Sequence, residues 1–181
     1  MLDRRVVPEA TLKQVGQGLE PAGPGWFVLN ARDARWREGV FGAGTTFEGS
    51  DDGQFTQLGI NINVLEPGQP MCMYHREEEQ EDFLVLAGEC LLLIEEEERP
   101  LKAWDFVHCP AGTNHVFVGA GTGLCTLVAV GSRTGGEIVY PVSELARRHN
   151  AGVPKETPDP KEAYAPFPHG DEAPYRDGWL P

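Results

Sequence analysis

The sequence lacks any long run of apolar residues. Its apolar stretches, such as Leu91–Ile94, are far shorter than the ~20 residues that a membrane-spanning helix needs. The first ten residues, MLDRRVVPEA, also lack the apolar segment of a secretory signal. We therefore expect a protein that does not cross a membrane and that resides in the cytoplasm.

Basic residues are scarce as well. The chain has 15 Lys and Arg against 28 Asp and Glu, which gives a formal net charge of −13. Nucleic acids and anionic membranes are bound through basic patches, and the sequence contains none. We therefore exclude nucleic acid and membrane as partners.

Cysteine is present at only four positions, 72, 90, 109 and 125, and no two of them form a CxxC pair. Without a secretion signal, such cysteines are expected to be reduced core residues and not a disulfide framework. The sequence also has no glycine-rich phosphate loop before a helix, no GxSxG motif and no paired zinc-knuckle spacing.

Glycine and proline are abundant by contrast, at 22 and 15 of 181 residues, and they separate many short apolar runs. Residues 57–64 alternate strictly between polar and apolar, which predicts a half-buried strand. The other predicted strands are Trp26–Asn30, Met71–His75, Glu81–Leu86, Glu89–Glu95, Pro100–Trp104, Phe106–Cys109, His115–Val118, Leu124–Val130 and Ile138–Tyr140. Many strands without helical periodicity between them predict an all-β sandwich or barrel.

The two ends of the chain differ from this central part. Residues 1–25 are polar and predict an N-terminal arm, whereas residues 26–140 form the expected barrel. In residues 141–181, Ser143 is placed to cap a short helix at 144–149, and a proline-rich tail follows. Because this tail keeps several aromatic residues, we expect it to dock on a barrel, either its own or that of a partner.

Two histidines and two glutamates stand out as candidate ligands. His75, Glu77 and Glu81 share parity along the chain, and His115 begins a later strand after the turn at 110–114. Imidazole and carboxylate groups that converge from separate strands can hold a divalent first-row transition metal. Glu78, Glu79 and Gln80 are expected to face solvent.

Two segments resemble the two conserved motifs of the cupin superfamily, in the expected order. These are PGQPMCMYHREEEQEDFLVLAGE, which includes Glu81-x6-Gly88, and WDFVHCPAGTNHVFVG, which includes Pro110-x-Gly112-x-x-His115. The resemblance implies a jelly-roll barrel of the double-stranded β-helix type. It also implies a homodimer and one metal ion held by the motif histidines and glutamate.

The first motif departs from the family pattern, because it has one histidine where the family has two. If His75 is the first of the pair, Glu77 occupies the second position and Glu81 keeps the correct spacing. If His75 is the second, Met73 takes the first position and the segment to Glu81 is one residue too long. We prefer the former, which gives a shell of His75, Glu77, Glu81 and His115 suited to Fe, Mn, Ni or Zn.

A small-molecule pocket with apolar walls is expected beside this metal. Its predicted lining consists of Met73, Phe83, Val85, Phe106, Phe117 and Leu127. His108 is expected to point outward. The sequence is thus consistent with a metal-dependent enzyme that acts on a small organic molecule as a dioxygenase, isomerase or decarboxylase. The alternative is a non-catalytic module that binds a small ligand with weak or no metal.

Overall fold

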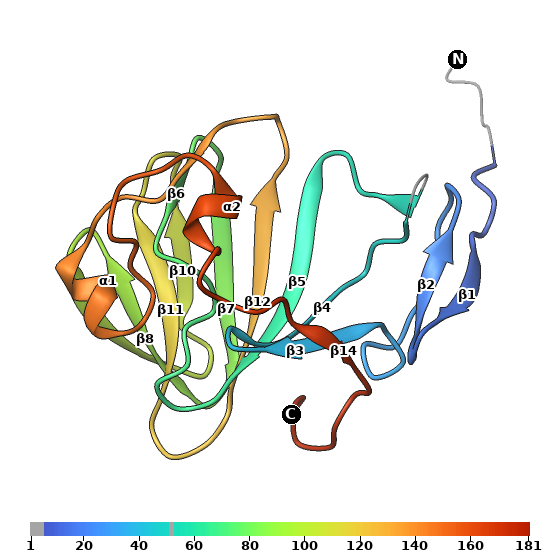
Figure 1. The fold of residues 1–181 in the computed structure, drawn as a ribbon. Coiled ribbons are helices and arrows are strands. Elements are labelled where there is room, and N and C mark those ends of the chain that lie inside the picture. Colours follow the sequence, from blue (N-terminus) through green and yellow to red (C-terminus); the bar gives the residue numbers. More distant parts are fainter. Residues whose placement is uncertain (1–5, 51–52) are drawn as a thin grey trace.

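Antiparallel strands make up most of the protein, whose computed structural model describes residues 6–50 and 53–181 (Figure 1). The largest sheet has the strand order β10-β7-β12-β5-β4-β3-β14. Its strands are β10 (Phe106–Cys109), β7 (Glu81–Ala87), β12 (Cys125–Ser132), β5 (Leu58–Leu65), β4 (Gly42–Thr46), β3 (Trp36–Gly39) and β14 (Asp171–Ala173).

A second sheet faces part of the first one. Its order is β11-β8-β9, formed by β11 (His115–Ala120), β8 (Glu89–Ile94) and β9 (Glu97–Lys102). Two short ribbons pair β1 (Thr11–Val15) with β2 (Gly18–Ala22) and β13 (Ile138–Val139) with β6 (Arg76–Glu77). The two short helices are α1 (Glu144–Arg148) and α2 (Pro160–Ala163). Within the described residues, no helix is long and apolar enough to span a membrane.

The main core lies between the two sheets. Phe83 and Val85 of β7 and Leu127 of β12 meet Leu92 of β8 and Phe117 of β11 in one buried cluster. Burial of these side chains is the main stabilising contribution at this position, roughly 1.5–3 kcal/mol for each large apolar residue. The arrangement is a jelly-roll of the double-stranded β-helix type, as predicted.

Strand β5 confirms the alternation seen in the sequence, but its apolar face does not line the barrel. Ile62 and Val64 pack with Trp36 and Trp179 in a separate cluster. Asn63, which pairs directly with Leu127, lies on the face that continues the barrel interior. The apolar stripe of β5 is thus covered by the C-terminal segment, an arrangement that alternation alone does not reveal.

Some of the predicted strands differ from those in the structure. Trp26–Asn30 is not a strand, since only Trp26 forms an isolated bridge, to Glu9. Strands β3 and β4 were not predicted, because WREG and GAGTT carry few apolar residues. These strands are stabilised by pairing with neighbouring strands, and such pairing does not appear in the strand propensity of their own residues.

The N-terminal arm also contains more structure than expected. Strands β1 and β2 form a hairpin, and Leu19 makes a bridge to Ala34 at the start of the main body. Residues 1–5 of the predicted arm lie outside the described residues. The boundaries at 25 and 140 remain predictions.

The C-terminal tail docks on its own barrel, which confirms the prediction made from its aromatic residues. Strand β14 pairs with β3 and extends the large sheet. Beyond it, the Trp179 ring lies 4.9 Å from the Trp36 ring, and its backbone carbonyl accepts a 2.6 Å hydrogen bond from Thr126 Oγ1. Helix α1 is also confirmed, with the Ser143 side chain accepting a hydrogen bond from the backbone N–H of Ala146.

Candidate metal centre

Reciprocal backbone hydrogen bonds bring the two predicted histidines together. The His75 N–H donates to the His115 carbonyl over 3.2 Å, and the His115 N–H donates back over 2.8 Å. His75 directly precedes β6 and His115 begins β11, so this bridge joins two segments forty residues apart. The imidazole ring centroids lie 4.9 Å apart as a result.

Each imidazole is oriented by the backbone just before it. His75 Nδ1 lies 2.8 Å from the Met73 carbonyl oxygen, and His115 Nδ1 lies 3.0 Å from the Thr113 carbonyl oxygen. A carbonyl can only accept, so both Nδ1 atoms carry a proton, and Nε2 is the ring nitrogen that each histidine turns toward the cluster. This is the arrangement by which outer hydrogen bonds fix metal-binding histidines.

Glu81, at the start of β7, completes the cluster. Its Oε2 lies 3.7 Å from His75 Nε2 and 3.2 Å from His115 Nε2. Ligand atoms of His75, Glu81 and His115 all lie within 4.8 Å of one another. Among the described residues, the buried His115 Nε2 finds no hydrogen-bond partner of acceptable geometry. An orphaned buried nitrogen beside a carboxylate fits a divalent transition metal.

Glu77 lies beside this cluster but outside it. Its Oε1 is 3.9 Å from His75 Nε2, and its side chain is the most accessible of the four. Burial and the charge of Glu81 raise the pKa of Glu77, although His75 opposes the shift. Whether Glu77 is a ligand therefore stays a prediction.

Met73, the alternative to Glu77, is buried elsewhere. It packs with Tyr140, Val153 and Ala163 and with aromatic residues of the C-terminal segment, separate from the core between the sheets. This placement favours the alignment in which His75 is the first residue of the histidine pair.

The charges of the cluster are strongly coupled. Burial would raise the pKa of Glu81, but the neighbouring imidazoles of His115 and His75 outweigh it and lower the pKa to about 2. Burial would also lower the pKa of His75, yet the Cys72 sulfur and the Glu81 carboxylate raise it well above its ordinary value. A cation is therefore favoured between these groups, whether it is a proton or a metal ion.

Most of the predicted pocket residues lie close to the cluster as a packed wall. Phe83, Val85, Phe117 and Leu127 are buried together, and the Phe83 ring lies 5.2 Å from the His115 ring. Glu81 and Glu77 retain 17% and 29% of their side-chain exposure, against 1% for His115. The two glutamates therefore form the solvent-accessible side of the cluster.

Two predicted pocket residues do not belong to this wall: Met73 is buried in a separate cluster, and the prediction that Phe106 lines the pocket is wrong. Phe106 is 64% exposed, whereas Val107 and Cys109 on the same strand are buried. Side chains alternate along a strand, so Phe106 must share the face of His108, which pairs with Asp82 on the outside over 2.6 Å. The expected outward position of His108 already implied this result.

The acidic segment after His75 contains one residue that supports the loop at 134–136. The Glu79 carboxylate accepts hydrogen bonds from the backbone N–H groups of Gly135 and Gly136, at 2.6 and 3.2 Å. Backbone hydrogen bonds from this loop, that of Gly136 first, lower the pKa of Glu79. Glu79 therefore holds a loop and does not point into the cluster.

Three residues near the cluster were missed in the sequence. Cys72 Sγ lies 3.7 Å from His75 Nδ1, and the Tyr140 ring lies 6.0 Å from the His75 ring. The hydroxyl of Tyr164, from the C-terminal segment, accepts a 3.1 Å hydrogen bond from the Met73 N–H. For Tyr164, the only signal in the sequence was the aromatic content of the C-terminal tail, which predicted that the tail docks on a barrel.

Comparison with known proteins supports this architecture. Residues 61–131 match the family model described as a cupin domain. A sugar phosphate isomerase of the cupin superfamily from Silicibacter pomeroyi shares 27% identity at a TM-score of 0.52, over 62% of this chain and 78% of that one. No curated protein is detectably similar to this chain.

Two further structures are similar at lower identity. A putative sugar phosphate isomerase from Acidithiobacillus ferrooxidans shares 23% identity at a TM-score of 0.51, over 62% of this chain and 78% of that one. A predicted oxalate decarboxylase from Thermotoga maritima shares 18% identity at a TM-score of 0.50, over 59% of this chain and 98% of that one. Together with the two sheets and the His75, Glu81 and His115 cluster, these matches show that the chain carries a cupin domain.

Proposed function

We propose that the protein is a metal-dependent enzyme that catalyses proton transfer on a small oxygenated molecule, as an isomerase does. The observation that carries the proposal is the cluster of His75, Glu81 and His115, in which both imidazoles turn Nε2 toward the Glu81 carboxylate. These three residues would hold one divalent transition metal, of the series Fe, Mn, Ni and Zn. When bound, such an ion supplies Lewis acidity that polarises a carbonyl or hydroxyl oxygen of the substrate.

Glu77 is suited to move the proton. Its carboxyl group lies at the accessible side of the cluster, 3.9 Å from His75 Nε2, where a carboxylate can act as a general base. A base at this position would remove a proton from a carbon next to the oxygen that the site polarises. Packing of Phe83 against His115 keeps water from the opposite side.

The choice of isomerase chemistry also draws on the comparisons. The Silicibacter pomeroyi protein, at 27% identity, is described as a sugar phosphate isomerase. Proton transfer between adjacent carbons needs one base and one polarised oxygen, which matches the groups present here. Fold alone would not select this reaction, because decarboxylases share the same barrel.

Exchange with solvent deuterium tests the proposal. Protein stripped by a chelator and reloaded with Fe, Mn, Ni or Zn is incubated in D₂O with aldoses, ketoses and their phosphates. We expect deuterium incorporation next to the carbonyl with one of the metals. Glu77→Gln should keep the metal but lose about 10²-fold or more in rate. Exchange that is indifferent to chelation or to Glu77→Gln would contradict the proposal.

The alternative is a non-catalytic module that binds a small ligand. The packed wall of Phe83 and Phe117, whose ring centroids lie 4.5 Å apart, favours it by limiting space next to His115. In that case the metal-loaded protein would bind one of these molecules reversibly, without any exchange of its carbon-bound protons.

A further inference from the structure

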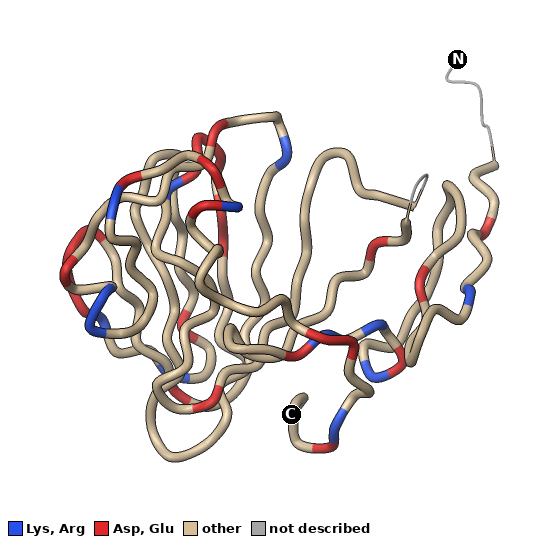
Figure 2. Tube along the Cα trace, in the orientation of Figure 1, with Lys and Arg blue, Asp and Glu red and all other residues tan. Residues whose placement is uncertain are grey.

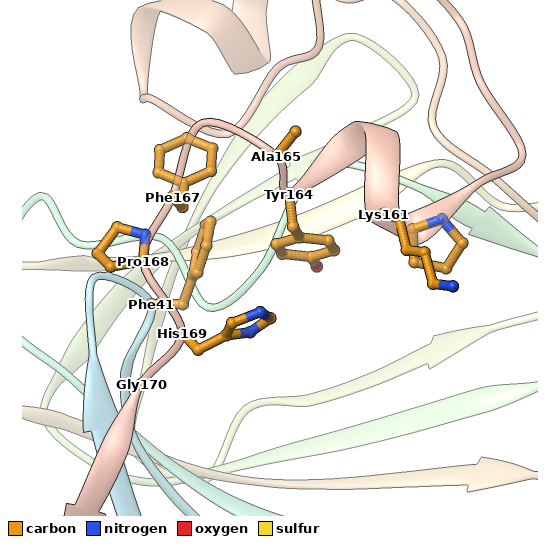
Figure 3. A pocket seen from close by; sticks show the side chains of 9 residues that line it. Phe41, Lys161, Tyr164, Ala165, Phe167, Pro168, His169 and Gly170 are labelled. Atoms are coloured by element: carbon orange, nitrogen blue, oxygen red, sulfur yellow. The ribbon is translucent and has the colours of Figure 1, made fainter.

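A cavity lies in the C-terminal segment, and none of the three cluster side chains lines it. It measures about 440 Å³ and is formed by residues 160–170 and by Phe41 in the turn between β3 and β4. Cavities of this size commonly hold small molecules. Figure 3 shows the rings of Phe41, Tyr164 and Phe167 around it, together with Lys161 and His169.

The aromatic rings form a fixed apolar wall. Phe41 packs edge-on against Tyr164 at 5.2 Å and against Phe167 at 5.0 Å between centroids. Tyr164 is held from behind, where its hydroxyl accepts the hydrogen bond from the Met73 N–H. A planar ring inserted here would meet other rings in the edge-to-face geometry that aromatic pairs prefer.

The charge of the lining is opposite to that of the protein as a whole. The chain carries a net charge of −13, and its acidic positions lie in many separate parts of the trace in Figure 2. The described residues that line this cavity nevertheless include Lys161 and His169 and no acid. A cationic ligand, which aromatic walls alone would attract, would be repelled by Lys161.

We propose that this cavity binds a small aromatic carboxylate, independently of the metal centre. The aromatic ring of the ligand lies against the wall of Phe41, Tyr164 and Phe167 at its Tyr164 end, and its carboxylate pairs with the ammonium group of Lys161, which lies beyond Tyr164 in Figure 3. The site goes beyond the proposed function, since it uses none of His75, Glu77, Glu81 or His115.

Calorimetric titration with benzoate and with benzamide tests the site, because the two probes differ in charge but hardly in shape. Benzoate should bind at least about fivefold more tightly than benzamide to the wild-type protein, as expected for a partly exposed ion pair. Lys161→Gln should abolish this preference, whereas Lys155→Gln, an exposed lysine in the same segment, should keep it. Phe167→Leu should weaken both probes by a similar factor.

His115→Ala separates this site from the metal centre. If the carboxylate bound to a metal ion at the cluster, benzoate binding would be lost in His115→Ala and kept in Lys161→Gln, which would overturn the proposal. Equal binding of benzoate and benzamide would overturn it as well. Sedimentation velocity of the same variants tests whether a second copy of the chain fills the cavity instead. The proposal would be overturned if the wild-type protein did not bind benzoate and formed a dimer that Phe167→Leu dissociates.

Discussion

At the scale of single residues, two backbone carbonyls determine what the histidines can do. The carbonyls of Met73 and Thr113 hold the Nδ1 protons of His75 and His115, and both Nε2 atoms therefore point toward Glu81. The carbonyls belong to the residues two positions earlier in each case. Any residue type can supply such a backbone carbonyl, so this arrangement leaves no recognisable pattern in the sequence.

The role of the missing family histidine can be settled by two substitutions. We expect Glu77→Gln and Met73→Leu each to keep close to the wild-type metal content, because neither residue belongs to the three-residue cluster. Plasma emission spectroscopy of the purified variants measures this. A sharp loss of metal in Glu77→Gln would make Glu77 the fourth ligand, and a loss in Met73→Leu would move the shell to Met73.

Glu20 gives a prediction about pH. Its buried carboxylate accepts a hydrogen bond from Ser50 and pairs with Lys13 Nζ at 3.1 Å, and these contacts outweigh burial to lower its pKa. A lowered pKa in the folded state means that the stabilisation is present above about pH 4.5 and is lost as the pH falls.

Glu20→Gln should therefore lower the melting temperature by a few degrees at pH 7 and by much less near pH 3. The exposed Glu156→Gln is the matched control and should change neither value. A melting-temperature difference that stays constant between the two pH values would show that the charge of Glu20 does not act in this way.

At the scale of elements, the C-terminal segment is part of the fold. It supplies β14 to the large sheet, Trp179 to the cluster around Trp36, and Tyr164 to the region behind Met73. The proline-rich composition of this segment resembles that of a free tail. Its aromatic residues were the signal that predicted docking, although the register with β3 could not be read from them.

Removing these contacts should destabilise the protein. We expect a chain that ends at Ala151 to melt well below the full-length protein, and Trp179→Ala to cost about 3–5 kcal/mol, because Trp179 is 5% exposed. Trp26→Ala, at a half-exposed tryptophan, should cost far less. Thermal unfolding followed by circular dichroism measures all three. An unchanged melting temperature in the truncated chain would show that the docked segment contributes no stability.

At the scale of the whole molecule, the sequence predicted the barrel, helix α1 and all three residues of the cluster. These parts depend on local signals: strict alternation, a capping serine, and histidine and glutamate at family spacing. Strands β3 and β4 and the position of Phe106 were not predicted correctly. Strands β3 and β4 depend on pairing with distant strands, which single-strand patterns describe poorly, whereas the outward position of Phe106 follows from the alternation that it shares with His108.

The outward position of Phe106 gives a prediction about assembly. Phe106, in the edge strand β10 of the large sheet, and Trp104, in the turn just before it, are 64% and 75% exposed. Exposed rings at a sheet edge favour contact with a second copy, and we therefore propose a homodimer through this edge. Sedimentation velocity should show a dimer that Phe106→Lys converts to a monomer. A wild-type protein that stays monomeric at high concentration would refute this interface.

The central claim is that His75, Glu81 and His115 hold a metal ion, and metal content tests it most directly. Wild-type protein purified without added metal should contain close to one transition-metal ion per chain. His115→Ala should lose most of this metal, whereas His108→Ala, which changes a histidine on the outer face, should retain it. Substoichiometric metal that His115→Ala leaves unchanged would contradict the account.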